Sequence, residues 1–180
     1  MKKIAFVLAL VLTMSVFAGC GSSASETTVP TTTAPAAAAP EGTTDELMNK
    51  IYENVTVELA LMNIPVDLAD EYAVSAYTGA ATAEGIVEAT ASEPMMGSQA
   101  YSITLARCES AEAAAALAQT MFDNIDTRKW ICVEATEKQA VVCGDLALFV
   151  MLNPEYGVTT DQIVEAFTAV CGGAVDSVIK

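Results

Sequence analysis

Hydrophobic and polar residues follow three different patterns along this chain. Residues 4–17 are almost all apolar, residues 21–44 are mostly small or polar, and from residue 45 apolar positions recur with helix and strand spacing. An apolar run near the start is typical of an export signal, whereas periodic apolar positions form the buried faces of helices and strands. The pattern therefore predicts a leader (1–19), a tether (20–44) and a single folded domain (45–180).

Helical spacing of apolar residues predicts four helices in the folded domain. They cover residues 45–55, 67–77, 111–124 and 160–170. Two of the predicted starts carry a capping box, Thr43 with Glu46 and Thr159 with Gln162. Residues 55–62 fit two patterns, because their apolar positions either continue the first helix or alternate as in a strand.

Alternating apolar positions predict five strands, at residues 86–92, 101–107, 130–135, 139–143 and 146–152. The last three have short connections, which favours an antiparallel meander. The final strand, LALFVML, is apolar on both faces, which is typical of a central strand covered on both sides. The order of elements predicts an α+β fold, an antiparallel sheet of about five strands with helices packed largely on one side.

The first twenty residues indicate where the protein is located. Two lysines precede the apolar run, and the run is shorter than the roughly 20 residues that a membrane-spanning helix needs. It ends in Val16-Phe17-Ala18-Gly19-Cys20, which resembles the lipobox of bacterial lipoproteins. The resemblance implies cleavage before Cys20, a lipid on its sulfur, and a protein held on the cell membrane facing outside the cytoplasm. A permanent anchor helix is the alternative. The lipid on Cys20 makes the membrane the first expected partner.

The tether is rich in Ser, Thr, Pro and Ala and has no aromatic residue. Such a segment buries too little apolar surface to offset the entropy of ordering, so we expect a disordered spacer.

Acidic residues outnumber basic ones, 23 to 8, for a formal charge of −15. Loss of Lys2 and Lys3 with the leader leaves six basic residues against 23 acidic ones, a formal charge of −17. Such a surface repels nucleic acid, so no nucleic-acid partner is expected. A basic protein or a small molecule is compatible with the charge, and so is a charge that only maintains solubility.

Four cysteines follow Cys20, namely Cys108, Cys132, Cys143 and Cys171. An exported protein can form disulfides, and four cysteines allow three complete pairings. If Glu137-Lys138 is a two-residue hairpin loop, Cys132 lies opposite Cys143, which makes them the candidate disulfide. Buried free thiols are the alternative. The chain has no histidine and no CxxC motif, so neither a metal site nor a cofactor is expected.

Two stretches together suggest a family. They are SEPMMGSQAYSITLAR (92–107) and IDTRKWICVEA (125–135), followed by a Gly-Asp turn and the apolar strand. This combination resembles the domain of unknown function 4358 family, small exported lipoproteins of Gram-positive bacteria. Thr127 departs from the proline of that family's Asp-Pro-Arg-Lys-Trp. The family has no assigned activity, so the resemblance implies a fold and a location without a mechanism.

The sequence contains no recognisable catalytic motif. Without histidine there is no Ser-His-Asp or Cys-His arrangement, and the glycines do not fall at phosphate-loop spacing. Carboxylate pairs such as Asp123 with Asp126 arise by chance among so many acids. We therefore expect a protein that is not an enzyme, with a carboxylate-based enzyme of the cell envelope as the alternative.

Two groups of residues could form binding sites. Arg107, Arg128 and Lys129 flank strand ends and could converge to bind an anion, unless each pairs with a nearby acid. Met95, Met96, Tyr101 and Trp130 could form an apolar contact surface, unless they fill the core. The sequence therefore predicts a membrane-anchored extracytoplasmic lipoprotein that works by binding or scaffolding, or as an accessory subunit of a membrane complex.

Overall fold

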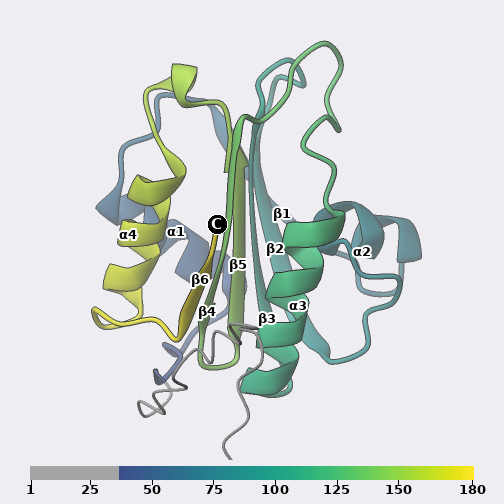
Figure 1. Ribbon diagram of the computed structural model, residues 1–180, viewed down its shortest axis with the longest axis vertical. Helices are drawn as coiled ribbons and strands as arrows, with labels where there is room; N and C mark the ends of the chain where they lie inside the picture. Colours follow the sequence, from purple (N-terminus) through teal and green to yellow (C-terminus); the bar gives the residue numbers. More distant parts are fainter. Residues whose placement is uncertain (1–36) are drawn as a thin grey trace, which may run out of the picture. The chain divides into compact units, whose positions relative to one another are not determined.

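Six strands form one antiparallel sheet in the computed structural model, which describes residues 37–180 (Figure 1). The spatial order is β1-β2-β3-β5-β4-β6, and every neighbouring pair is antiparallel. The bounds are β1 Leu61–Pro65, β2 Ile86–Pro94, β3 Tyr101–Cys108, β4 Glu137–Cys143, β5 Leu146–Leu152 and β6 Ser177–Ile179. The predicted α+β fold is confirmed, with six strands where about five were expected. Cys20 lies outside the described residues.

The helices lie on both faces of the sheet. Figure 1 shows α1 (Thr44–Asn54) and α4 (Thr160–Val170) on one face, and α2 (Glu71–Thr78) and α3 (Ala111–Asn124) on the other. The prediction that they pack largely on one side is wrong. Strand β5 explains why, because all seven of its residues are buried and both of its faces need a cover.

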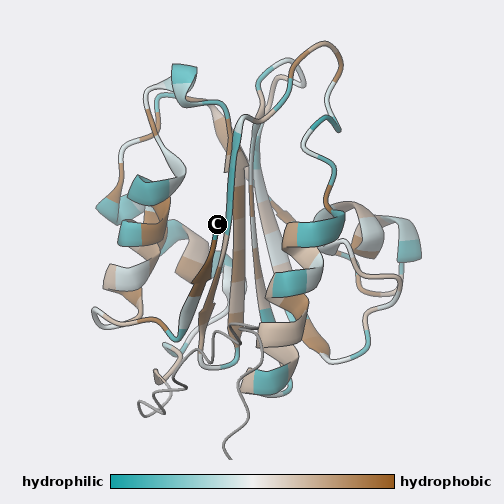
Figure 2. Cartoon of the chain, in the orientation of Figure 1, coloured by the Kyte–Doolittle hydropathy of each residue, from teal (hydrophilic) through white to brown (hydrophobic). Residues whose placement is uncertain are grey.

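Two apolar cores result from this arrangement, one on each face of the sheet (Figure 2). Neighbouring residues of a strand point to opposite faces, so Leu148 enters the first core, under α1 and α4, and Phe149 enters the second, under α3. The helix facing the second core contributes small residues, Ala114 and Ala118, which let it lie close to the strands.

Local signals at the helix starts are confirmed. Thr43 accepts a hydrogen bond from the backbone N–H of Glu46 at 3.2 Å, and the Glu46 carboxylate accepts one from the N–H of Thr43 at 3.0 Å. Thr159 and Gln162 form the second predicted capping box. Each box satisfies backbone donors that the first helical turn leaves unpaired.

Residues 130–135 form a loop, so the predicted strand there is wrong. The Asp126 carboxylate accepts from the N–H of Arg128 at 2.8 Å and starts a turn, and Cys132 has φ +65°, which is incompatible with an extended strand. Strand β4 begins at Glu137, so Glu137 and Lys138 pair with Leu152 and Met151 and form no hairpin loop. Only β4 and β5 of the expected three-strand meander exist, joined at Gly144-Asp145.

A short segment before α1, residues 37–42, packs on the domain, although it was predicted to belong to the tether. We call it the strap. The Ala37 N–H donates to Asp176 Oδ1 at 2.7 Å, and Arg107 Nη2 donates to the Pro40 carbonyl at 2.8 Å. Ala37 and Ala39 also pack against the first core. The strap therefore enters the domain at the β4–β5 turn, where Asp176 also accepts from the Gly144 N–H at 2.6 Å.

Candidate functional site

Lys129 connects the loop between α3 and β4 to the sheet. Its ammonium forms an ion pair with Glu93 of β2 and donates to Ser102 Oγ of β3 at 3.2 Å. Ser102 Oγ in turn donates to the Glu93 carboxylate at 2.8 Å. The Lys129 and Glu93 side chains are about one fifth exposed, 21% and 18%. A largely buried pair of this kind holds the loop in a fixed position.

Two aromatic rings complete the surroundings of Lys129. Its Nζ lies 5.1 Å from the ring centroid of Tyr77 in α2 and 5.3 Å from that of Trp130. Both distances suit a cation–π contact. A serine beside a lysine can act as a nucleophile only where substrate reaches it. Ser102 is 1% exposed, so this cluster is suited to positioning the loop and unsuited to catalysis.

Exposed apolar side chains lie close to the two members of this ion pair in sequence or in strand register. Met95 and Met96, in the loop between β2 and β3, are 70% and 59% exposed, and Ile131, two residues after Lys129, is 82% exposed. Met62 of β1, 47% exposed, is the register partner of Glu93. We call these four residues the methionine surface. The predicted exposure of Met95 and Met96 is present in the structure.

The other two residues of the predicted apolar surface are not exposed in the same way. Tyr101 is 0% exposed, and its hydroxyl lies 3.3 Å from that of Tyr52, so its proposed role in a contact surface is wrong. Burial raises the pKa of Tyr101, as expected for a core phenol. Trp130 is half-buried and packs against the second core. The indole is therefore only partly available to a contact surface.

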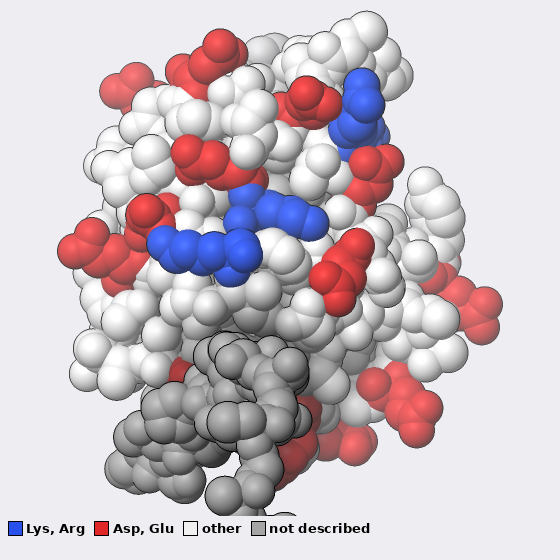
Figure 3. Space-filling model, viewed as in Figure 1, with Lys and Arg blue, Asp and Glu red and all other residues white. Residues whose placement is uncertain are grey.

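The three predicted anion-binding residues do not converge. Arg107 Nη1 lies 2.7 Å and 2.9 Å from the two carboxylate oxygens of Asp145, at the end of β3 near the strap. Lys129 contacts Ser102 near the other end of β3, and five strand residues span about 17 Å. Arg128 pairs with Glu134 at 3.1 Å in the exposed loop. The expectation of one anion site is therefore wrong, because each cation has its own carboxylate (Figure 3 shows basic groups next to acidic ones).

The predicted Cys132–Cys143 disulfide is also wrong. Cys132 is exposed in the loop before β4, whereas Cys143 is buried at the far end of β4. The seven residues of β4 separate them by about 20 Å. The prediction failed because it placed a hairpin turn at 137–138, where β4 has already begun.

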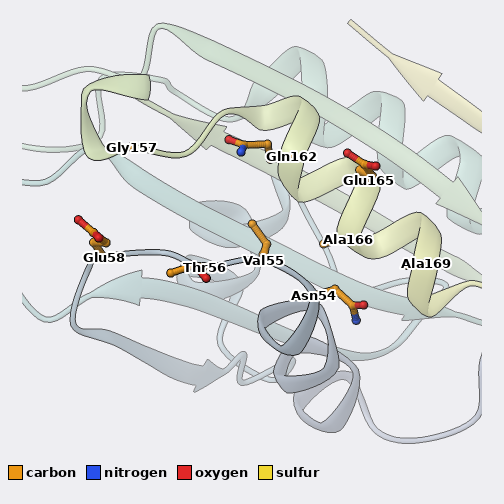
Figure 4. Close-up of a pocket in the computed structure, with 9 residues that line it drawn as sticks. All are labelled: Asn54, Val55, Thr56, Glu58, Gly157, Gln162, Glu165, Ala166 and Ala169. Carbon is orange, nitrogen blue, oxygen red and sulfur yellow. The ribbon is translucent and has the colours of Figure 1, made fainter.

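A groove of about 740 Å³ lies between the segment that follows α1 and helix α4 (Figure 4). Its lining residues are Asn54, Val55, Thr56, Glu58, Gly157, Gln162, Glu165, Ala166 and Ala169. In Figure 4 its two carboxylates come from separate walls, Glu58 from the loop and Glu165 from α4. The lining has no basic side chain, so the groove suits a neutral or cationic ligand. No sequence motif marked these residues, since the groove depends on how α1 and α4 pack.

Within residues 37–180 no group of three side chains is arranged to hold a metal ion. No helix in that range is long and apolar enough to cross a membrane. No protein family, curated protein or solved structure matches this chain. The resemblance to the domain of unknown function 4358 family and the lipidation of Cys20 stay predictions.

Proposed function

We propose that this protein is a lipid-anchored extracytoplasmic binding module that contacts a partner protein through the methionine surface. The observation that carries the proposal is the exposure of four large apolar side chains, Met62, Met95, Met96 and Ile131, on segments that the β1–β2 pairing and the Lys129–Glu93 ion pair hold together. Grouped exposed apolar residues on a soluble domain are typical of an interaction site. Methionine side chains are flexible and polarizable, so they adapt to the shape of a partner.

The position of this surface in the fold supports the same proposal. The strap enters at the β4–β5 turn, and the methionine surface lies at the opposite end of the sheet, where β2 meets β3. Strand β5 runs between the two ends over about 20 Å. A domain held at the strap therefore presents the methionine surface away from its attachment point.

The charge of the domain indicates which partners suit it. The acidic excess favours a partner that combines an apolar anchor with basic residues around it. Glu93 and Glu134 lie near the methionine surface, and both already pair with a cation, so we expect the basic residues of the partner to contact the wider acidic surface.

Site-specific photo-crosslinking in living cells tests the proposal. A photoreactive residue at Met96 should give one discrete crosslinked protein, whereas the same residue at Val178 of β6, another exposed apolar position, should not. The double change Met95→Gln and Met96→Gln should abolish co-purification of the crosslinked protein from detergent extracts. The change Val87→Gln should leave this co-purification intact. Equal crosslinking at both positions would refute the assigned surface. Retention of a Cys20→Ala protein on the membrane would refute the anchor separately.

A further inference from the structure

Cys143 and Cys171 lie in the first core, and Cys143 is next to the strap. Cys143 is the last residue of β4 and Cys171 is the C-cap of α4, and both side chains belong to the first core. Each thiol influences the pKa of the other, so the two side chains are neighbours in this core. Cys143 is 0% exposed and Cys171 8%, so little solvent reaches the pair. Among the described cysteines, Cys108 lies in the second core and Cys132 in an exposed loop, away from this pair.

Chain connections on both sides keep the two thiols together. After α4 the chain turns back, and the Asp176 N–H donates to the Val142 carbonyl, one residue before Cys143, at 2.8 Å. Ser177 then pairs with Val142 as β6 joins the sheet. On the other side, Cys143 Sγ lies 4.0 Å from the Ala38 carbonyl of the strap. The strap, the end of β4 and the end of α4 are thus packed at one place.

We propose that Cys143 and Cys171 form a disulfide in the mature protein, which links the end of α4 covalently to the end of β4. The proposal rests on the exported location given under the proposed function, because an exported thiol pair meets an oxidising environment. Each thiol loses its proton and one S–S bond forms between them. The two electrons pass to an external disulfide, that of a thiol oxidoreductase or a low-molecular-weight disulfide, which is reduced to two thiols. The reaction passes through a mixed disulfide that the second cysteine resolves.

The surroundings of the pair indicate when the bond forms. Burial raises the pKa of Cys171 and of Cys143, so the attacking thiolate is scarce once the core has closed. The bond therefore forms while the C-terminal segment is still open, during folding after export. The same burial then protects the bond from reductants.

Peptide mapping tests the proposal without any substitution. Trypsin cuts after Lys138 and leaves Cys143 and Cys171 in one peptide, 139–180, whereas Cys108 and Cys132 fall in the separate peptides 108–128 and 130–138. The full chain is extracted from membranes, denatured, alkylated without reduction and digested. Peptide 139–180 should carry no alkyl group and be two hydrogens lighter than its thiol form, and it should take up two alkyl groups after reduction. The other two peptides should each be alkylated without reduction.

Two results of this mapping would overturn the proposal. One is peptide 139–180 with two alkyl groups before reduction, and the other is a crosslink between it and peptide 130–138. A second arm refolds the purified chain in a glutathione redox buffer, where the bond should close regardless of cellular location. Failure to close there overturns the pairing itself. If the bond closes in the buffer but the thiols are free in protein from membranes, the disulfide is not a feature of the mature protein. The mass of the peptide that begins at Cys20 shows independently whether the lipid anchor is present.

Discussion

Gly144→Ala is predicted to release the strap from the domain. Gly144 has φ +55°, a left-handed conformation that costs an alanine about 1–2 kcal/mol. A Cβ at this position would lie 2.8 Å from the Ala37 carbonyl oxygen and 2.8 Å from the Ala39 nitrogen. Both neighbours are backbone atoms, so the strap has to move away to accommodate the methyl group.

The size of the effect follows from the bonds that the strap makes. Its displacement breaks the Ala37–Asp176 and Arg107–Pro40 hydrogen bonds, each worth about 0.5–1.5 kcal/mol. With the conformational cost, the free energy of unfolding should fall by about 2–5 kcal/mol. Gly157→Ala is the matched control, because Gly157 has φ +80° and no atom within 4 Å of the added Cβ. The free energy of unfolding of Gly157→Ala should fall only by the cost of the left-handed backbone, about 1–2 kcal/mol.

Urea unfolding of a chain that begins at Gly21 measures this difference, with the single tryptophan as the fluorescence probe. A gap of about 2 kcal/mol between the two variants corresponds to about 4–8 °C in Tm. Elastase should also cleave the alanine-rich strap faster in Gly144→Ala than in Gly157→Ala. Equal stabilities and equal cleavage rates would refute the packed strap.

Three further predictions concern the rest of the domain. Lys129→Met should destabilise the fold by about 2–3 kcal/mol in urea unfolding, because it leaves the Glu93 carboxylate largely buried without its cation. Adding Glu93→Gln to this variant should recover part of the lost stability. No recovery would contradict a coupled pair. The hydrogen bond from Lys180 and then that from Gln139 lower the pKa of Asp161, so this carboxylate stabilises the fold above its unfolded pKa of about 3.9, and the contribution is lost as pH falls through the lower folded value. Asp161→Asn should therefore lower Tm near neutral pH and not in strong acid, and an equal loss at both would contradict the assignment. Reduction of the proposed disulfide opens a loop of about 28 residues and should lower the stability by about 3–4 kcal/mol, whereas a Tm insensitive to reductant would contradict it.

Local signals in the sequence were sufficient to predict where the helices lie. The capping boxes at Thr43 and Thr159 need only residues three positions apart, so they could be identified without the fold. The apolar pattern of β5 also predicted a strand covered on both sides, and that pattern already conflicted with helices on one face. The helix placement could have been corrected from this strand alone.

Residues 130–135 show where local patterns fail. Their β-branched and aromatic residues favour a strand, but the Asp126 turn and the left-handed backbone of Cys132 hold them in a loop. Strand β6 has only three residues and gives little periodic signal. The short length of β6 and the tertiary contacts of the loop explain these two errors. Strand β1 was also not predicted, because Leu61 and Met62 belong to the stretch that fitted both a helix and a strand.

The candidate site depends on contacts between distant segments. Glu93 and Lys129 are 36 residues apart in sequence, and their pairing requires the path of the loop after α3. The exposure of Met95 and Met96 could be anticipated from their loop, whereas the burial of Tyr101 depends on the packing of the first core, where its hydroxyl meets that of Tyr52 from α1. Such long-range pairs cannot be derived from spacing along one chain.

The strap has a mechanical consequence. If Cys20 is fixed in a membrane, any force on the domain is transmitted through the strap, and the Ala37–Asp176 and Arg107–Pro40 bonds bear it before the strands of the sheet do. These few bonds should break at lower load than the ladder of six strands. Detachment of the strap would then free a segment of at most about 20 Å, from 3.3–3.6 Å per residue, while the sheet and both cores stay folded. The domain would thus gain reach under tension and regain its bound strap when the tension ends.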